Sequence, residues 1–292
     1  MVLSNKSGPG WKGVALYDSH TDTPVRMAQV DGVIRVPVSN PAVSDQLRDF
    51  VPTGTTPVHC FGRQVITSAK TNVDIWGGPT DTQPEPDTSG YALFVKSDDA
   101  QDDTDVGAGV PGTGAHTVHI HYMDTAYAEQ TVSASLNGTT EVDTGVTDCI
   151  FVTEHHVTGF GAGGGIVATG NIDCLAGSGG AVVSRVQAAG NQSMSTMCVV
   201  PAGKKMELRG WHAYGTAATT KLASIRPRAS MHDGVSNPGV YHFLGDGEFK
   251  DFSSPWLSMS DTLPEKVAMK MSGWTTGAIT IGGGYFGWFE DV

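Results

Sequence analysis

The stretch that decides the fold is TGAHTVHIHYMD, residues 113–124, in which apolar and polar side chains alternate. Successive side chains of an extended strand point to opposite faces, so Val118 and Ile120 share one face and the histidines at 119 and 121 share the other. Such alternation is typical of a half-buried strand in an antiparallel sheet. We therefore expect a strand here, with an apolar inner face.

The same alternation recurs on both sides of this stretch, between segments rich in Gly, Pro, Asn and Asp. It is found in RQVITSAKTNVDIW, YALFVKS, QTVSASLN, CIFVTEHHV, GIVATGNI and AVVSRVQ, and later in STMCVVPAGKKMELRGWHAYGT and AITIGGGYFGWFEDV. Strands spaced by roughly 8 to 15 residues, with turn residues between them, favour an antiparallel sandwich. We predict a mainly β fold of antiparallel β-sandwich or jelly-roll architecture, with two packed β units preceded by an extended N-terminal arm.

This pattern divides the chain into three segments. Residues 1–62 are expected to be the extended arm, with one short helix after Asn40, where Pro41 suits the first helical position. Residues 63–190 are expected to form the first antiparallel β-sandwich. Residues 191–292 are expected to form the second, which is jelly-roll-like because its strands end in an aromatic terminal strand.

One turn within the first sandwich has a specific sequence signal. Asn137-Gly138 is the pair that a type I′ hairpin turn requires, because both central residues adopt a positive φ. We expect it to join EQTVSASL to TEVDTG as a hairpin.

Composition excludes several classes of protein. The formal net charge is −12, and no stripe of Lys and Arg is present to displace counterions, so neither direct nucleic-acid binding nor binding to an anionic membrane is expected. No apolar run reaches the length of about 18 residues that spans a bilayer, and the N-terminus lacks the apolar core of a signal peptide. We expect assembly in a cytoplasm, where the four widely spaced cysteines remain free thiols.

The histidines raise the question of a metal site. His119 and His121 share a strand face, whereas His116 points to the other face. Two imidazoles on one face can bind zinc, but a closed site needs three or four ligands, and the neighbouring His155 and His156 also divide between two faces. Histidines on an exposed strand surface are the simpler interpretation.

The acidic loop KSDDAQDDTDVGAG is a second candidate. Asp103, Asp105 and Gly107 resemble part of a calcium-binding loop, in which carboxylates surround a hard cation at a tight turn. The loop lacks the bidentate Glu at its required spacing, so a solvated hairpin loop is favoured.

Catalysis is not indicated. The sequence contains no G-x-S-x-G elbow or other local catalytic signature, so we predict no catalytic residues, no cofactor and no enzyme activity. A metal-dependent jelly-roll enzyme of the cupin kind is the alternative that a metal bound by His119 and His121 would support.

The run GTGAHTVHIHYMDTAYAEQTVSASLNGTTEVDTG, residues 112–145, resembles a motif of structural proteins of tailed bacteriophages, especially those of marine and cyanobacterial hosts. The shared features are a G-T-G-A-x-T-V opening, a D-x-x-Y-x-E turn and an L-N-G-T-T-x-V-x-T segment. The resemblance extends over residues 60–292 through VPAGK at 200–204 and PEK at 264–266. It implies a β-sandwich protein of the capsid-decoration or head–tail-associated kind, and no catalytic residues.

From this resemblance we expect a non-enzymatic virion component that decorates or cements the capsid or the head–tail region. Its partners would be copies of itself, as a trimer or higher ring, and other virion proteins such as major capsid, portal or tail proteins. The alternative is a tail fibre or tip protein that recognises host surface glycans. In that case exposed aromatic side chains near the C-terminus would stack on sugars, namely Trp256, Trp274, Tyr285, Phe286, Trp288 and Phe289.

Overall fold

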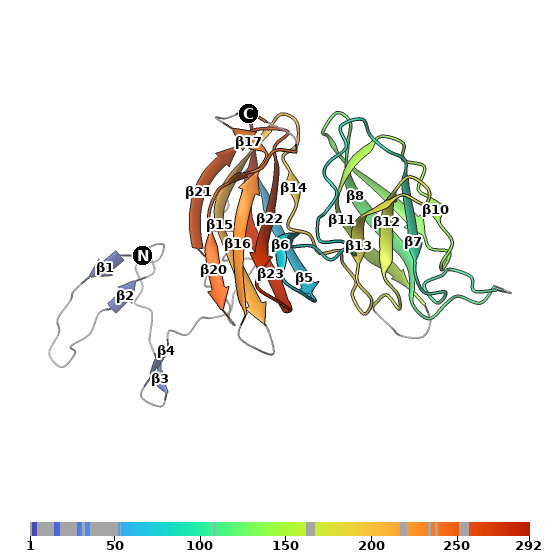
Figure 1. Cartoon of the computed structure of the whole chain (residues 1–292), viewed down its shortest axis with the longest axis horizontal. Coiled ribbons are helices and arrows are strands. Elements are labelled where there is room, and N and C mark those ends of the chain that lie inside the picture. Colours follow the sequence, from blue (N-terminus) through green and yellow to red (C-terminus); the bar gives the residue numbers. More distant parts are fainter. Residues whose placement is uncertain are drawn as a thin grey trace. The chain divides into compact units, whose positions relative to one another are not determined.

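A computed structural model describes the backbone of residues 2–4, 15–17, 28–30, 33–35, 52, 54–107, 109–161, 167–216, 221–232, 235–236, 239–250 and 257–292 (Figure 1). The chain divides into two compact units, Met1–Pro52 and Thr53–Val292. Every strand pair between described residues is antiparallel, and the predicted mainly β class is confirmed.

The first unit contains two short strand pairs. Strand β1 (Val2–Ser4) pairs with β2 (Ala15–Tyr17), and β3 (Ala28–Val30) pairs with β4 (Val33–Arg35). The helix predicted after Asn40 lies outside the described residues.

A jelly roll is built by eight strands of the second unit. They are β5 (Thr56–Ile66), β6 (Lys70–Asp74), β15 (Lys204–Thr216), β16 (Leu222–Ala229), β20 (Gly247–Lys250), β21 (Leu257–Leu263), β22 (Ala268–Thr275) and β23 (Ile279–Asp291). One sheet has the order β21-β15-β23-β5, and in the other β6 pairs with β22, β22 with β16, and β16 with β20. This pairing of β5 with β23, β6 with β22, β15 with β21 and β16 with β20 is the jelly-roll arrangement.

Short strands extend this body. Strand β14 (Cys198–Val199) pairs with β22, and β19 (His242–Phe243) pairs with β16. Strands β17 (Met231–His232) and β18 (Val235–Ser236) form a small hairpin.

One apolar core lies between the two jelly-roll sheets. Met206 and Leu208 of β15 and Tyr285 of β23 contribute from one sheet, and Ile225 and Met271 contribute from the other. A register shift in β15 between Leu208 and residue 210 changes which positions face inward. Before this bulge the even-numbered residues of β15 face the core, and after it the odd-numbered residues do. One face of β15 therefore remains buried along the strand.

A second sandwich is inserted in the jelly roll between β6 and β14. Its strands are β7 (Leu93–Ser97), β8 (Ala115–Asp124), β9 (Glu129–Ser135), β10 (Val142–Asp143), β11 (Cys149–Phe160), β12 (Ile172–Ala176) and β13 (Ala181–Val186). The sheets β10-β7-β12-β13 and β11-β8-β9 enclose a core that includes Val118 and Ile120, as the alternation at 113–124 predicts. We call this body the insert.

Two details differ from the sequence predictions. Strands β5 and β6 pair with β23 and β22, so residues 56–74 belong to the jelly roll, whereas the prediction placed residues 56–62 in the extended arm and residues 63–74 in the first sandwich. The turn at Asn137-Gly138 has the expected positive φ of 54° at the glycine, but it joins no hairpin, because β9 pairs with β8 and β10 pairs with β7. The segment crosses between sheets, which local turn chemistry does not specify.

The packing of β22 against β16 gives a testable prediction. Gly273 lies opposite Ile225, and a Cβ atom at this position would overlap the backbone carbonyl oxygen of Ser224. Gly273→Ala should therefore lower the free energy of unfolding by about 1–3 kcal/mol, as overpacking does in other cores. At Gly77 an added Cβ would have its closest neighbour at 3.5 Å, so Gly77→Ala is the matched control. Equal denaturant midpoints for the two variants would contradict this account of the packing.

Candidate functional site: a histidine cluster beside a cleft

Three histidines meet on the outer face of the insert. His119 and His121 come from β8, and antiparallel pairing with β11 places His156 directly opposite His119. The ring centroids lie 4.8 Å apart for His119 and His121, 5.6 Å for His119 and His156, and 5.7 Å for His121 and His156. The sequence predicted the first pair and the division of His155 from His156, but the third ring required the register of β8 and β11.

Hydrogen bonds orient two of these rings. Nδ1 of His119 lies 2.9 Å from Oγ of Ser133, and Nδ1 of His156 lies 3.1 Å from Oε1 of Glu154. Burial and the neighbouring His119 lower the pKa of His121. Among the residues that the structure describes, no group of three or more His, Cys, Asp or Glu is placed to hold a metal ion. The arrangement is a cluster of imidazoles in mutual contact, with one carboxylate beside it.

His155 and His116 have different surroundings. His155 is fully buried, and its Nε2–H donates to the carbonyl oxygen of Ile172 at 3.2 Å while its Nδ1 accepts from Oγ of Ser184 at 3.0 Å. Burial lowers its pKa to about 4, so the ring is neutral near pH 7. His116 lies on the opposite side of β8 from the cluster, as predicted, with Nε2 2.8 Å from the carbonyl oxygen of Gly112.

The acidic loop is organised by its own backbone. Oδ1 of Asp103 accepts from the amide of Asp105 at 2.8 Å, and Oδ1 of Asp105 accepts from the amides of Gly107 and Gly109 at 2.8 and 3.1 Å. These are successive Asx turns, which fold a loop without a cation. The two carboxylates that the sequence brought forward as calcium ligands therefore bind backbone amides.

The neighbouring Asp102 was missed by the sequence analysis. It is fully buried, and its carboxylate accepts four hydrogen bonds of 2.7 to 2.9 Å. The donors are the amides of Ala115, Thr169 and Gly170 and the hydroxyl of Ser97. Four bonds compensate for its desolvation and join the β7–β8 loop to the β11–β12 loop at one end of the insert. Within the run DDAQDD, no local signal distinguishes this buried aspartate from its neighbours.

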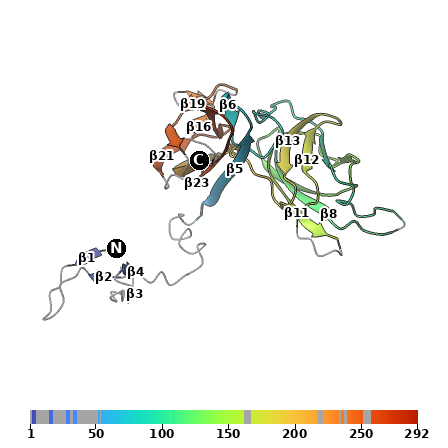
Figure 2. The same ribbon diagram turned by 60° about the horizontal axis from the view of Figure 1, so that its bottom comes forward.

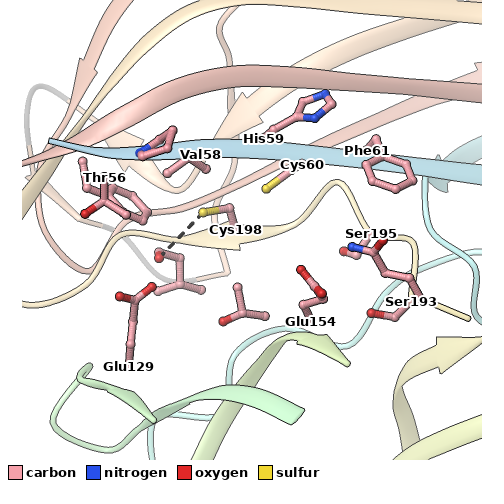
Figure 3. A pocket seen from close by; sticks show the side chains of 15 residues that line it. Thr56, Val58, His59, Cys60, Phe61, Glu129, Glu154, Ser193, Ser195 and Cys198 are labelled. Carbon is pink, nitrogen blue, oxygen red and sulfur yellow. Dashed lines mark hydrogen bonds between the residues drawn. The ribbon is translucent and has the colours of Figure 1, made fainter. Parts of the chain in front are cut away.

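A cleft of about 170 Å³ lies between β5 and the outer face of the insert (Figure 3). Figure 2 shows β5 on the side of the jelly roll that is next to the insert. Cys60 and Cys198 line the jelly-roll side, and Glu129 and Glu154 point toward β5 from the insert side (Figure 3). Glu154 also borders a second hollow of about 290 Å³, which His156 and Gln192 line. The cleft and the histidine cluster therefore share Glu154.

The connection that returns from the insert forms one wall of the cleft. The amide of Ser193 donates to the carbonyl oxygen of His155 at 2.8 Å, and Ser195 bridges to both Phe61 and Trp76. The outgoing connection is held by Lys270, whose Nζ lies 3.0 Å from Asp74 and 2.6 Å from Glu85. These contacts fix the walls of the cleft relative to each other.

The C-terminal aromatic side chains are mainly core residues. Tyr285, Trp288 and Phe289 are buried, and Arg209 lies over the Trp288 ring at 4.5 Å. Trp274 and Phe286 are half-buried, and Trp256 lies outside the described residues.

The neutral state of His155 makes stability depend on pH. An imidazole whose pKa is 6.5 in the unfolded chain and about 4 in the folded protein stabilises the fold fully above pH 6.5, and this contribution is lost as pH falls toward 4. The loss should reach about 3 kcal/mol, because each unit of pKa difference corresponds to about 1.4 kcal/mol. Denaturant unfolding at pH 7 and pH 4.5 should show a smaller difference for His155→Gln than for the wild type. If the wild type and the variant showed the same difference, His155 would bind its proton as well in the folded state as in the unfolded state.

No known family model matches the sequence, and no curated protein matches it. Among solved structures, the chain has 8% identity to a structure of the Gx strain of infectious bursal disease virus, covering 81% of this chain and 71% of that one with a TM-score of 0.22. A structure of the Gt strain has 8% identity, coverage of 85% and 77%, and a TM-score of 0.21. Similarity this low carries no argument about the fold or function of this chain.

Proposed function

We propose that the chain is a non-enzymatic structural subunit of a phage virion, which decorates or cements the capsid or the head–tail region through contacts with copies of itself and with other virion proteins. The jelly roll alone does not select this role, because the same architecture serves capsid proteins, lectins and cupins. The resemblance of residues 60–292 to structural proteins of tailed phages supports it, together with one feature of the surface.

That feature is the outward face of β5, which carries the proposal. β5 is the last strand of the sheet β21-β15-β23-β5, and Phe61 and Val65 on its outer side are 37% and 57% exposed. They share one face with His59 and Arg63, which are also exposed. Single exposed apolar side chains are ordinary, but two on the same face of an edge strand, with Arg63 between them, offer a surface that a neighbouring subunit would cover.

The neighbouring part of the same sheet is flat and weakly charged. Across β23, Thr280 pairs with Val65 and Gly284 pairs with Phe61, and the Tyr214 ring lies over Gly282. A flat face of this kind suits close approach of another protein.

The receptor-binding alternative needs an exposed aromatic platform for sugars. Burial of Tyr285, Trp288 and Phe289 favours the structural role, because it leaves only Trp274 and Phe286, both half-buried, among the C-terminal aromatics that the structure describes. Specific binding of the protein to host envelope glycans, lost in Trp274→Ala, would support the alternative instead.

In the proposed function the N-terminal arm docks on neighbouring subunits. Deleting residues 1–52 tests this docking. The cut must precede β5, because that strand pairs with β23 along its whole length, from Thr56 to Ile66. The truncated protein should keep its β-sheet circular dichroism and cooperative unfolding but should fail to load onto particles. Normal loading of the truncated protein would remove the docking role of the arm.

Substitution on β5 tests the contact surface. Phe61→Asp and Val65→Asp should each weaken assembly by about tenfold or more, since burial of one such side chain contributes about 1.5–3 kcal/mol. Sedimentation and particle-loading assays measure this effect. Val110→Asp is the matched control, because Val110 is 54% exposed in a loop of the insert. Equal assembly of all three variants would place the subunit contacts elsewhere.

A further inference from the structure

Two cysteines line the same cleft where the insert joins the jelly roll. Cys60 lies on β5, and Cys198 lies on β14, which belongs to the opposite sheet. Figure 3 shows the two side chains as neighbours along one wall of the cleft, with the Cys198 sulfur hydrogen-bonded away from Cys60. The Cys198 thiol donates to the carbonyl oxygen of Val199 at 3.8 Å, and Cys60 packs against the same apolar core in which Cys198 and Tyr285 are buried.

Both thiols border the cleft of about 170 Å³, and Cys60 is only half-buried. The other two cysteines, Cys149 and Cys174, are fully buried in the core of the insert. A small reagent that enters the cleft therefore has access to the first pair, whereas the second pair becomes accessible only when the insert opens.

The thiol pKa values also distinguish Cys60 from the two cysteines in the core of the insert. The neighbouring Cys198 side chain lowers the pKa of Cys60, which increases the fraction of its nucleophilic thiolate. Burial raises the pKa of Cys149 to about 12 and that of Cys174 well above its usual value. Cys60 is thus the attacking thiol, and Cys198 is positioned to react second.

We propose that Cys60 and Cys198 are a redox pair that forms an intrachain disulfide when the protein meets a small disulfide such as oxidised glutathione. The Cys60 thiolate attacks one sulfur of oxidised glutathione and displaces one glutathione thiolate, which gives a mixed disulfide. Cys198 then loses its proton and attacks the Cys60 sulfur, and the second glutathione thiolate leaves. The two cysteine thiols are oxidised, one oxidised glutathione is reduced to two thiols, and the departing thiolates take up the two protons.

The bond would connect the two jelly-roll sheets at the base of the insert. The loop that it closes contains the whole insert, so the disulfide would strongly restrict the unfolded chain. Passage of a virion from a reducing cytoplasm to an oxidising exterior would supply the change in redox conditions, which rests on the proposed function, whereas the reaction of the two thiols does not.

The experiment uses the full-length protein, fully reduced and then incubated under native conditions with oxidised glutathione. Titratable thiols should fall from the four of the reduced chain to two, the intact mass should decrease by about 2 Da for the two hydrogens lost, and peptide mapping should find Cys60 joined to Cys198. Cys60→Ala and Cys198→Ala should each abolish the cross-link. Cys149→Ala and Cys174→Ala are the matched controls and should retain it.

Three outcomes would overturn the proposal. They are four thiols remaining in the native protein, a mixed disulfide with glutathione that persists on Cys60, and a cross-link between chains on a non-reducing gel. Because the alanine variants may unfold, the denaturant midpoint of the wild type provides a second measurement, and it should rise on oxidation and return on reduction. Particle loading of the oxidised and reduced proteins is measured separately. Absence of the cross-link contradicts the redox pair, whereas absence of loading contradicts the virion function.

Discussion

The structure depends on one constraint, which is that strands from opposite ends of residues 53–292 must pair. β5 and β6 begin this unit, and they complete the two jelly-roll sheets only by pairing with β23 and β22 at its end (Figure 1). The entropy of closing a long loop grows slowly with its length, so an insert that folds around its own core adds little to the cost of this pairing. β23 permits close contact because glycines on both of its faces leave room for neighbouring groups, such as the Tyr214 ring over Gly282.

The cleft is a direct consequence of this pairing. The insert leaves the jelly roll after β6 and returns at β14, and both strands pair with β22, so its two connections converge. Lys270, on β22 itself, binds Asp74 of the outgoing strand and Glu85 of the insert's first loop. Breaking a buried ion pair leaves an uncompensated charge, so this contact holds the connection in one geometry. Both cysteines line the cleft, because Cys198 belongs to the returning strand β14 and Cys60 to β5, which forms the jelly-roll wall.

Local pattern predicted the mainly β class, the inner and outer faces of residues 113–124, and the division of His155 from His156 between two faces. These features depend on a period of two residues, which is visible in one strand. Pairing between distant strands has no such local signal, so β5 and β6 were placed in the wrong body, and the turn at Asn137-Gly138 was expected to join a hairpin. The same limit applies to the site. The addition of His156 to the cluster, the burial of Asp102 and the approach of Cys60 to Cys198 all require register or tertiary contacts.

The surroundings of Cys60 also determine how its proposed oxidation would proceed. The neighbouring Cys198 side chain lowers the pKa of Cys60, but burial and the nearby carboxylate of Glu154 act in the opposite direction. Thiol–disulfide exchange needs the thiolate, and these opposing effects limit the fraction of Cys60 that is ionised. We therefore expect oxidation of Cys60 by oxidised glutathione to be slow. Oε1 of Glu154 also lies 3.1 Å from Nδ1 of His156. The histidine cluster is thereby linked to the thiol pair through a single carboxylate, although the two groups lie on different bodies of the fold.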